Sequence, residues 1–189
     1  MAPTRAHRAH PPVAVAWFDS PFGPLVGQSM GELVTALAFT ASAPPELHPP
    51  AWPPTQGRAG VLEQLGDELA AYWAGEALAF TVALDWSRVG GFRHDVLVAT
   101  AQIPYGRTTT YGGLAERVGR VGQARAVGGV LRSNPWVIVV GCHRVLGADG
   151  ALTGYGGGPR TGGRLDVKAS LLAHEAEWNE PTLFGAGLG

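Results

Sequence analysis

The chain is organised around the stretch Trp136-Val-Ile-Val-Val-Gly-Cys-His-Arg-Val145. This stretch contains the only cysteine of the protein, Cys142, directly before His143 and Arg144. A run of five apolar residues that ends in glycine predicts a short buried strand followed by a turn. We expect the strand to be a rigid support and the turn to present a thiol, an imidazole and a guanidinium in that order.

Length and composition restrict the architecture. The chain has 189 residues, 46% of them hydrophobic, which suits one domain or one main domain with a smaller partner. No stretch is long enough for a membrane span, and the N-terminus lacks the apolar centre of a signal peptide. A single cysteine excludes an internal disulfide and a cysteine-rich zinc site. We therefore expect a protein of the reducing cytoplasm. We also expect it to act as a monomer with no metal and no cofactor.

Charge is distributed unevenly along the chain. Residues 13–92 contain eight acidic residues and two arginines, whereas residues 103–145 contain six arginines and one acidic residue. Such a local excess of positive charge indicates an anionic partner, with nucleic acid first among the candidates. A basic face that is merely solvated is the alternative explanation.

The N-terminal part predicts a small antiparallel sheet with one helix. Residues 1–12 are expected to be a disordered tail, and residues 13–88 an N-terminal α/β domain. Apolar positions at helical spacing predict a helix over 60–74, and the turn Ser20-Pro-Phe-Gly-Pro24 separates the first two strands. The expected strands are 13–18, 25–28, 33–39 and 79–84.

The C-terminal part, residues 89–178, predicts a mainly helical domain, followed by a tail over 179–189. Two of its helices are short and are separated by a glycine-containing turn, which is typical of a helix-turn-helix. Thr110 is a suitable N-cap for the first of them. The expected helices are 92–102, 112–118, 123–131 and 165–178. The fold class is therefore α+β, with a short active-site strand beside the helix-turn-helix.

The second short helix is poor in bulky side chains. Ala126, Gly128 and Gly129 leave Arg125 as the long polar side chain among small neighbours, although each glycine costs roughly 1 kcal/mol against alanine in a helix interior. Close packing against another helix would explain these residues. Close approach to a nucleic-acid groove would explain them equally well.

Cys142 has two interpretations from spacing alone. A buried cysteine at a strand end is commonly a small hydrophobic residue. A reactive thiol needs a base or a cation nearby, and His143 is adjacent, with Glu175 as a candidate to orient the histidine. Two functional classes stay open at this point: a cysteine hydrolase, and an alkyl-accepting thiol beside a DNA-binding unit.

Seven motifs in one order resemble the O6-alkylguanine-DNA alkyltransferases, the methylated-DNA–protein-cysteine methyltransferases. The resemblance covers about residues 92–178. In chain order the motifs are Ile103-Pro-Tyr-Gly106, Thr110-Tyr-Gly112, Ala124-Arg-Ala-Val-Gly-Gly129, Arg132-Ser-Asn-Pro135, Cys142-His-Arg-Val145, Leu152-Thr-Gly-Tyr-Gly-Gly-Gly158 and Leu171-Leu-Ala-His-Glu175.

The resemblance implies a catalytic set. Cys142 matches the thiol that accepts the alkyl group from guanine O6 and is not regenerated. His143 matches the residue that deprotonates this thiol through a water, and Glu175 the carboxylate that orients the histidine. Tyr111 matches a tyrosine that packs near the flipped nucleotide and donates toward the base.

The resemblance also implies binding residues for a double-stranded DNA that carries O6-alkylguanine. Arg125 matches an arginine finger that fills the gap left in the duplex, on a helix that enters the minor groove. Asn134 matches a hinge asparagine between this helix and the active-site stretch. The remaining expected substrate contacts are Val145, Tyr155 and Gly156, and the remaining expected DNA contacts are Thr110, Ala124, Ala126, Gly128 and Gly129.

One departure from the family pattern lies inside the site, because Gly141 stands where the family normally has proline before the cysteine. Two alternatives remain. An alkyltransferase-like protein binds DNA lesions without transfer, but proteins of that type replace the acceptor cysteine. A cysteine hydrolase would turn over many times and would have no use for a helix-turn-helix or for Arg125.

Overall fold

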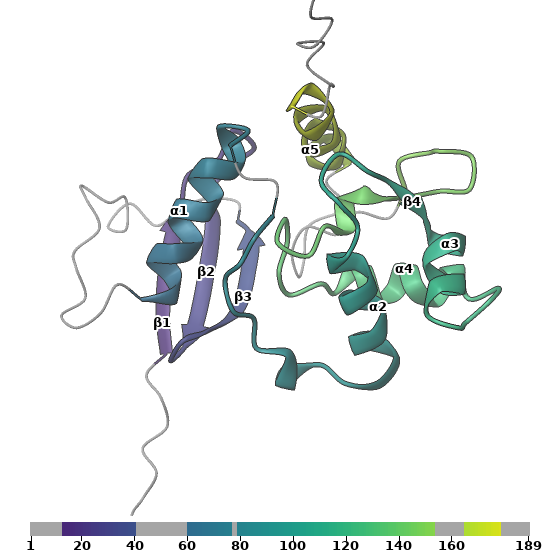
Figure 1. Ribbon diagram of the computed structural model, residues 1–189, viewed down its shortest axis with the longest axis horizontal. Helices are drawn as coiled ribbons and strands as arrows, with labels where there is room; N and C mark the ends of the chain where they lie inside the picture. The colour runs from purple at the N-terminus through teal and green to yellow at the C-terminus, as the bar shows by residue number, and fades with distance from the viewer. Residues whose placement is uncertain (1–12, 41–59, 77–78, 154–164, 179–189) are drawn as a thin grey trace, which may run out of the picture.

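An antiparallel sheet covered by one helix forms the N-terminal part of the computed structural model, which describes residues 13–40, 60–76, 79–153 and 165–178. The strands β1 (Val13–Phe18), β2 (Leu25–Met30) and β3 (Leu33–Phe39) lie in that order. Figure 1 shows α1 (Val61–Trp73) across one face of this sheet, and β3 as the strand nearest the C-terminal helices.

Local sequence explains why α1 lies close to the sheet. Leu62, Leu65 and Leu69 recur at helical spacing and are buried. Opposite them, a Cβ atom on Gly27 would lie 2.7 Å from the ring of Phe18. Glycine at this position of β2 therefore leaves room for the aromatic ring between sheet and helix.

The C-terminal part contains four α-helices among the described residues: α2 (Gly91–Ala101), α3 (Tyr111–Arg117), α4 (Ala124–Arg132) and α5 (Leu165–Trp178). The predicted N-cap is confirmed, since the side chain of Thr110 accepts a hydrogen bond from the backbone N of Gly113 at 3.0 Å. Gly119 and Gly122 have φ angles of 70° and 79° in the α3–α4 turn, a conformation that favours glycine.

The predicted strand over 136–140 is wrong. Trp136 forms a single bridge with Leu37, and the chain then turns, with Val139 N donating to the carbonyl of Val137 at 2.9 Å and Val140 N to that of Trp136 at 2.9 Å. Ile138 has a φ of 71° within this turn. An unbroken apolar run signals burial, and burial is equally compatible with tight turns in the core.

Two further elements differ from the predicted strands. Among the described residues after the cysteine, the only strand is β5 (Val145–Leu146), which follows η3 (Cys142–Arg144). It pairs in parallel with β4 (Thr109–Thr110). The predicted strand over 79–84 is also wrong, because only Leu84 forms a bridge there, with Val34. The α+β class itself is confirmed.

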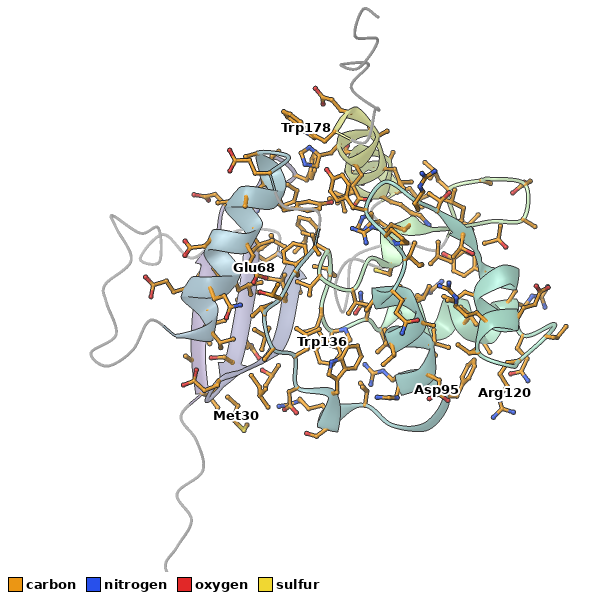
Figure 2. The ribbon with its side chains drawn as sticks, in the orientation of Figure 1. Met30, Glu68, Asp95, Arg120, Trp136 and Trp178 are labelled. Carbon is orange, nitrogen blue, oxygen red and sulfur yellow. The ribbon has the colours of Figure 1, made fainter. Side chains whose placement is uncertain are left out.

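The stretch before the cysteine is anchored on the edge of the sheet. Leu37 N donates to the carbonyl of Pro135 at 2.7 Å, and Val137 N donates to the carbonyl of Leu37 at 3.1 Å. Trp136 is fully buried, and its indole N–H donates to the carbonyl of Val34 at 2.9 Å. Trp136 therefore lies between the sheet and the C-terminal helices (Figure 2).

Within the part of the chain that the structure describes, no helix combines the length and the apolar character that crossing a membrane requires.

Candidate active site

Cys142 begins a one-turn 3₁₀ helix, η3 (Cys142–Arg144), and its side chain is buried. Asn134, which follows α4, donates its Nδ2 to the Cys142 Sγ at 3.2 Å and to the carbonyl of Val140 at 2.8 Å. Its Oδ1 accepts from the backbone N of Trp136 at 3.0 Å. Asn134 thus ties the end of α4 to both ends of the stretch that leads to the thiol.

The resting thiol is protonated. Burial raises the pKa of Cys142, and this effect outweighs the Asn134 hydrogen bond and the positive charge of Lys168, which both lower it. A thiol in such an environment is a weak nucleophile until a base removes its proton.

Glu175 on α5 is the acceptor for several donors from distant parts of the chain. Its carboxylate accepts from His143 Nε2 at 2.7 Å, from the backbone N of Gly106 at 2.9 Å and from the hydroxyl of Tyr72 at 2.8 Å. Arg144 adds a forked pair, with Nη2 at 2.8 Å from Oε1 and Nε at 2.9 Å from Oε2. The carboxylate is 1% exposed, so these groups replace the water that it has lost.

These donors decide the charge of Glu175 and the tautomer of His143. Burial alone would raise the pKa of the Glu175 carboxyl, but hydrogen bonds from His143 and Arg144 hold it well below its usual range. An ionised carboxylate can only accept, so His143 Nε2 carries the proton of the neutral ring. Nδ1 is then the free acceptor, and it is buried with no hydrogen-bond partner among the described residues.

His143 is neutral at physiological pH. Burial lowers its pKa, and the hydrogen bond and charge of Glu175 oppose this only in part. A neutral imidazole with an unpaired Nδ1 has the chemistry that a general base needs, and this one belongs to the residue directly after the thiol.

Tyr111 starts α3 and packs against α4. A Cβ on Gly128 would lie 3.7 Å from the Tyr111 ring, an ordinary van der Waals distance, so the ring lies against α4 and this contact alone does not require glycine. The Tyr111 hydroxyl donates to the carbonyl of Thr153 at 2.7 Å. Burial raises the pKa of Tyr111, and a negative charge on Cys142 would raise it further, so the phenol stays a donor.

Lys168 is a site residue that the sequence interpretation missed. It is fully buried on α5, and its Nζ donates to the carbonyls of Val145 at 2.6 Å and Thr153 at 2.9 Å. The ammonium lies 5.6 Å from the centre of the Tyr111 ring. Spacing contained the signal, because Lys168 lies on the same helix face as the buried Leu171 and Glu175.

Five of the six predicted DNA-contacting residues lie on α4, and the sixth, Thr110, is the N-cap of α3. Val127 and Leu131 are buried, whereas Arg125, Ala126 and Gly129 are exposed on its other side. A Cβ on Gly129 would meet no heavy atom within 4 Å. The glycine is therefore not explained by packing within the described residues.

The structure brings most of the predicted catalytic residues into one network, while two predicted substrate contacts cannot be placed. His143 contacts Glu175, and Cys142, which precedes His143 in the chain, contacts Asn134. Tyr111 and Lys168 share the carbonyl of Thr153 as an acceptor, and the charge of Lys168 acts on Cys142. Tyr155 and Gly156 lie outside the described residues. The Val145 carbonyl is present in the network as an acceptor for Lys168.

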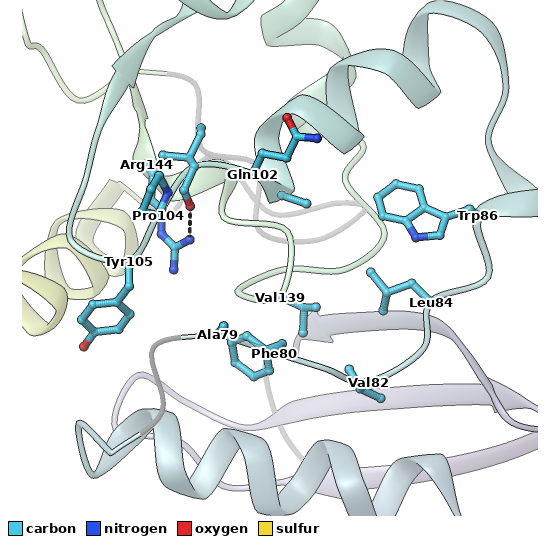
Figure 3. A pocket seen from close by; sticks show the side chains of 12 residues that line it. Ala79, Phe80, Val82, Leu84, Trp86, Gln102, Pro104, Tyr105, Val139 and Arg144 are labelled. Carbon is cyan, nitrogen blue, oxygen red and sulfur yellow. Dashed lines mark hydrogen bonds between the residues drawn. The ribbon is translucent and has the colours of Figure 1, made fainter.

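A pocket of about 300 Å³ lies next to this network, and Arg144 forms part of its wall (Figure 3). Residues from 79–86 and 101–105 and Val139 line the rest, and neither Cys142 nor His143 is among them. Arg144 Nη1 donates to the carbonyl of Ile103 at 2.7 Å within this wall. Arg144 therefore separates the pocket from the carboxylate that it binds.

No group of three or more His, Cys, Asp or Glu side chains in the described part of the chain is arranged to hold a metal ion.

Comparisons with known proteins agree on one family. The family described as "6-O-methylguanine DNA methyltransferase, DNA binding domain" matches residues 91–177. The methylated-DNA–protein-cysteine methyltransferase of Mycobacterium tuberculosis is 44% identical over 160 residues, which cover 83% of this chain and 88% of that protein. The protein of the same description from Methanosarcina acetivorans is 36% identical over 160 residues, covering 85% of this chain and 96% of that protein.

A solved structure agrees with these relatives. The crystal structure of Mycobacterium tuberculosis OGT in complex with DNA superposes with a TM-score of 0.69 at 37% identity, covering 87% of this chain and 93% of that chain.

Proposed function

Because the chain belongs to the methylated-DNA–protein-cysteine methyltransferase family, we propose that it repairs O6-alkylguanine in double-stranded DNA by moving the alkyl group to Cys142. The observation that carries this proposal is the buried hydrogen bond between Glu175 and His143, which directly follows a protonated thiol held by Asn134. No metal or cofactor enters the mechanism.

Proton transfer comes first. The unpaired Nδ1 of His143 takes the thiol proton through a water molecule, and Glu175 steadies the imidazolium that forms. The positive charge of Lys168 favours the thiolate, since it opposes the effect of burial on the pKa of Cys142. The thiolate of Cys142 therefore forms only when His143 accepts the proton.

Alkyl transfer follows. The sulfur forms a bond to the alkyl carbon while the bond between that carbon and guanine O6 breaks, and the electron pair of the broken bond stays on the guanine. The dealkylated nucleobase needs one proton to become neutral guanine, and the thiol has released one, so the overall step balances. Tyr111 stabilises the developing negative charge by hydrogen bonding, which requires its hydroxyl to exchange Thr153 for the base. The product thioether has no easy reverse, so each molecule acts once.

DNA binding presents the base. Guanine O6 is hidden in the duplex, so the nucleotide must rotate out of the stack into the site. We assign α4 to the minor groove, with Arg125 filling the vacated position and the small exposed residues allowing close approach. One molecule carries the full set of residues, which supports action as a monomer. A free thiol must stay reduced, which supports a cytoplasmic location.

Intact-mass measurement tests the transfer. After incubation with a duplex that carries O6-methylguanine, the wild type should gain the mass of one methyl group, and Cys142→Ala should gain nothing. No gain on the wild type, or an equal gain on the variant, would refute transfer to Cys142.

The same experiment separates the alternatives. Tight binding of the modified duplex without a mass gain would indicate lesion recognition alone. Repeated turnover by one molecule would indicate hydrolysis instead of transfer.

A further inference from the structure

We propose that Tyr72 of α1 is a positioning residue for the His143–Glu175 pair, so that the N-terminal part of the chain moderates the strength of the base. This inference rests on the proposed function. The evidence is a direct contact between the N-terminal helix and the carboxylate that His143 uses.

The contact is short and fully buried. The Tyr72 hydroxyl donates to Glu175 Oε1 at 2.8 Å, and the tyrosine is 1% exposed. Oε1 is also the oxygen that His143 Nε2 contacts at 2.7 Å. Burial and then the charge of Glu175 raise the pKa of Tyr72, so its hydroxyl stays protonated and donates.

Packing holds the Tyr72 ring in one orientation. Its ring centroid lies 4.8 Å from that of Trp73 and 5.6 Å from that of Tyr105, both edge to face. His174, the neighbour of Glu175 on α5, places its Nε2 3.0 Å from the backbone carbonyl of Tyr72. The end of α1 therefore contacts α5 both at Glu175 and at the residue before it.

The Tyr72 hydroxyl competes with His143 for one oxygen. A donor on Oε1 draws electron density from the carboxylate and weakens its stabilisation of a protonated His143. Removing this donor should strengthen the His143–Glu175 hydrogen bond and make His143 easier to protonate. Among the described residues, the other ionisable or charged groups around the pair are Tyr105, Arg144 and Lys168, with Cys142 next to His143 in the chain. Glu177 acts on Tyr105.

Two tyrosines give a matched pair of variants. Tyr72→Phe removes only the hydroxyl that contacts Glu175. Tyr105→Phe removes the neighbouring buried hydroxyl, which has no hydrogen-bond partner among the described residues, and keeps the ring that packs on Tyr72. Both variants lose the same atom from the same aromatic cluster, so a general packing effect should be similar in the two.

Two measurements test the proposal. Single-turnover transfer to Cys142 across about pH 6 to 9 should show the acid limb of the Tyr72→Phe profile at higher pH, with rates below it reduced about threefold or more. The His143 Nε2–H proton resonance should move downfield in Tyr72→Phe, as its hydrogen bond to Glu175 strengthens. Tyr105→Phe should match the wild type in both measurements.

The outcomes are distinct. A Tyr72→Phe profile that keeps the wild-type midpoint, whether or not the rate falls uniformly, overturns the positioning role, as does an unchanged resonance. Equal changes in both variants also overturn it, because they would reflect packing. If the wild type transfers no alkyl group, the proposed function fails, while the resonance still reports whether Tyr72 acts on His143.

Discussion

Gly141 shows how one missing Cβ is coupled to the charge network. Its φ of −68° is one that proline also adopts, so the backbone angle alone does not explain the glycine. A Cβ at this position would lie 2.9 Å from Arg144 Cδ and 3.0 Å from Arg144 Cζ. Arg144 cannot easily move aside, because Glu175 and the carbonyl of Ile103 hold its guanidinium. Glycine therefore allows this path of the arginine across the backbone before the thiol.

Stability should fall in two stages as a solution of the protein is acidified. Burial lowers the pKa of His143 in the folded protein. Below about pH 6.5, the unfolded chain therefore binds a proton at this histidine that the folded chain does not bind. The pKa of Glu175 is also lowered in the folded protein, so below about pH 4.3 the unfolded chain binds a second proton, at this carboxylate, that the folded chain does not bind. In both ranges the unfolded state binds more protons, and the free energy of unfolding decreases as pH falls.

Urea unfolding of the wild type and Glu175→Gln at a series of pH values measures both stages. At neutral pH the variant should lose about 3–5 kcal/mol, because Arg144 is left without its buried partner. The variant should also lack the lower stage. If that stage is unchanged in Glu175→Gln, another carboxylate is responsible for it.

At the scale of elements, the helices and the N-terminal sheet were predictable from periodicity. The predicted helix over 165–178 agrees with α5, and the others differ by one residue at each end. The turns that residues 136–140 form in place of the predicted strand were not predictable, because they depend on hydrogen bonds to Leu37 that an apolar run does not encode. Tertiary contacts, which a single sequence does not contain, decide this segment.

The candidate site was predictable where motifs carry it and hidden where packing does. Cys142, His143 and Glu175 lie in recognisable motifs, and the structure places His143 against Glu175. Tyr72 lies in the core stripe of α1, where an aromatic residue is expected for packing, and nothing local shows that its hydroxyl reaches α5. The two-domain boundary at residue 88 stays a prediction.

On the exposed face of α4, a substitution that stabilises the fold should weaken DNA binding. Gly129→Ala should raise the free energy of unfolding by about 0.5–1 kcal/mol, since the new Cβ meets no heavy atom within 4 Å. The same methyl group should weaken binding to duplex DNA if α4 approaches a groove closely. Urea unfolding and fluorescence anisotropy with a labelled duplex measure the two effects.

A control variant distinguishes the loss of a side chain that contacts DNA from the steric effect of an added methyl group. Arg125→Ala on the same face should also weaken duplex binding, but without the gain in stability that replacing glycine provides. Wild-type affinity in Gly129→Ala would show that this face does not approach the DNA.

At the scale of the whole molecule, the sheet and the C-terminal helices should unfold as one unit. Trp136 joins them, since its indole N–H donates to the carbonyl of Val34 at 2.9 Å while its ring lies 4.8 Å from that of Trp86. Trp136→Phe keeps an aromatic ring but loses the donor and some buried volume, which should cost about 1–3 kcal/mol. Leu37 and Tyr72 also form hydrogen bonds between the N-terminal and C-terminal parts. We therefore expect the loss of stability to affect both parts.

Amide hydrogen exchange, followed separately for β2 and α2, distinguishes one cooperative unit from two. In the wild type the slowest amides of both elements should report the same free energy of opening, and Trp136→Phe should lower both by the same amount. A decrease confined to one element would mean that the two parts open independently. Tyr72 could then separate from Glu175 while the C-terminal helices stay folded, and the N-terminal part would moderate His143 only when the two parts are closed.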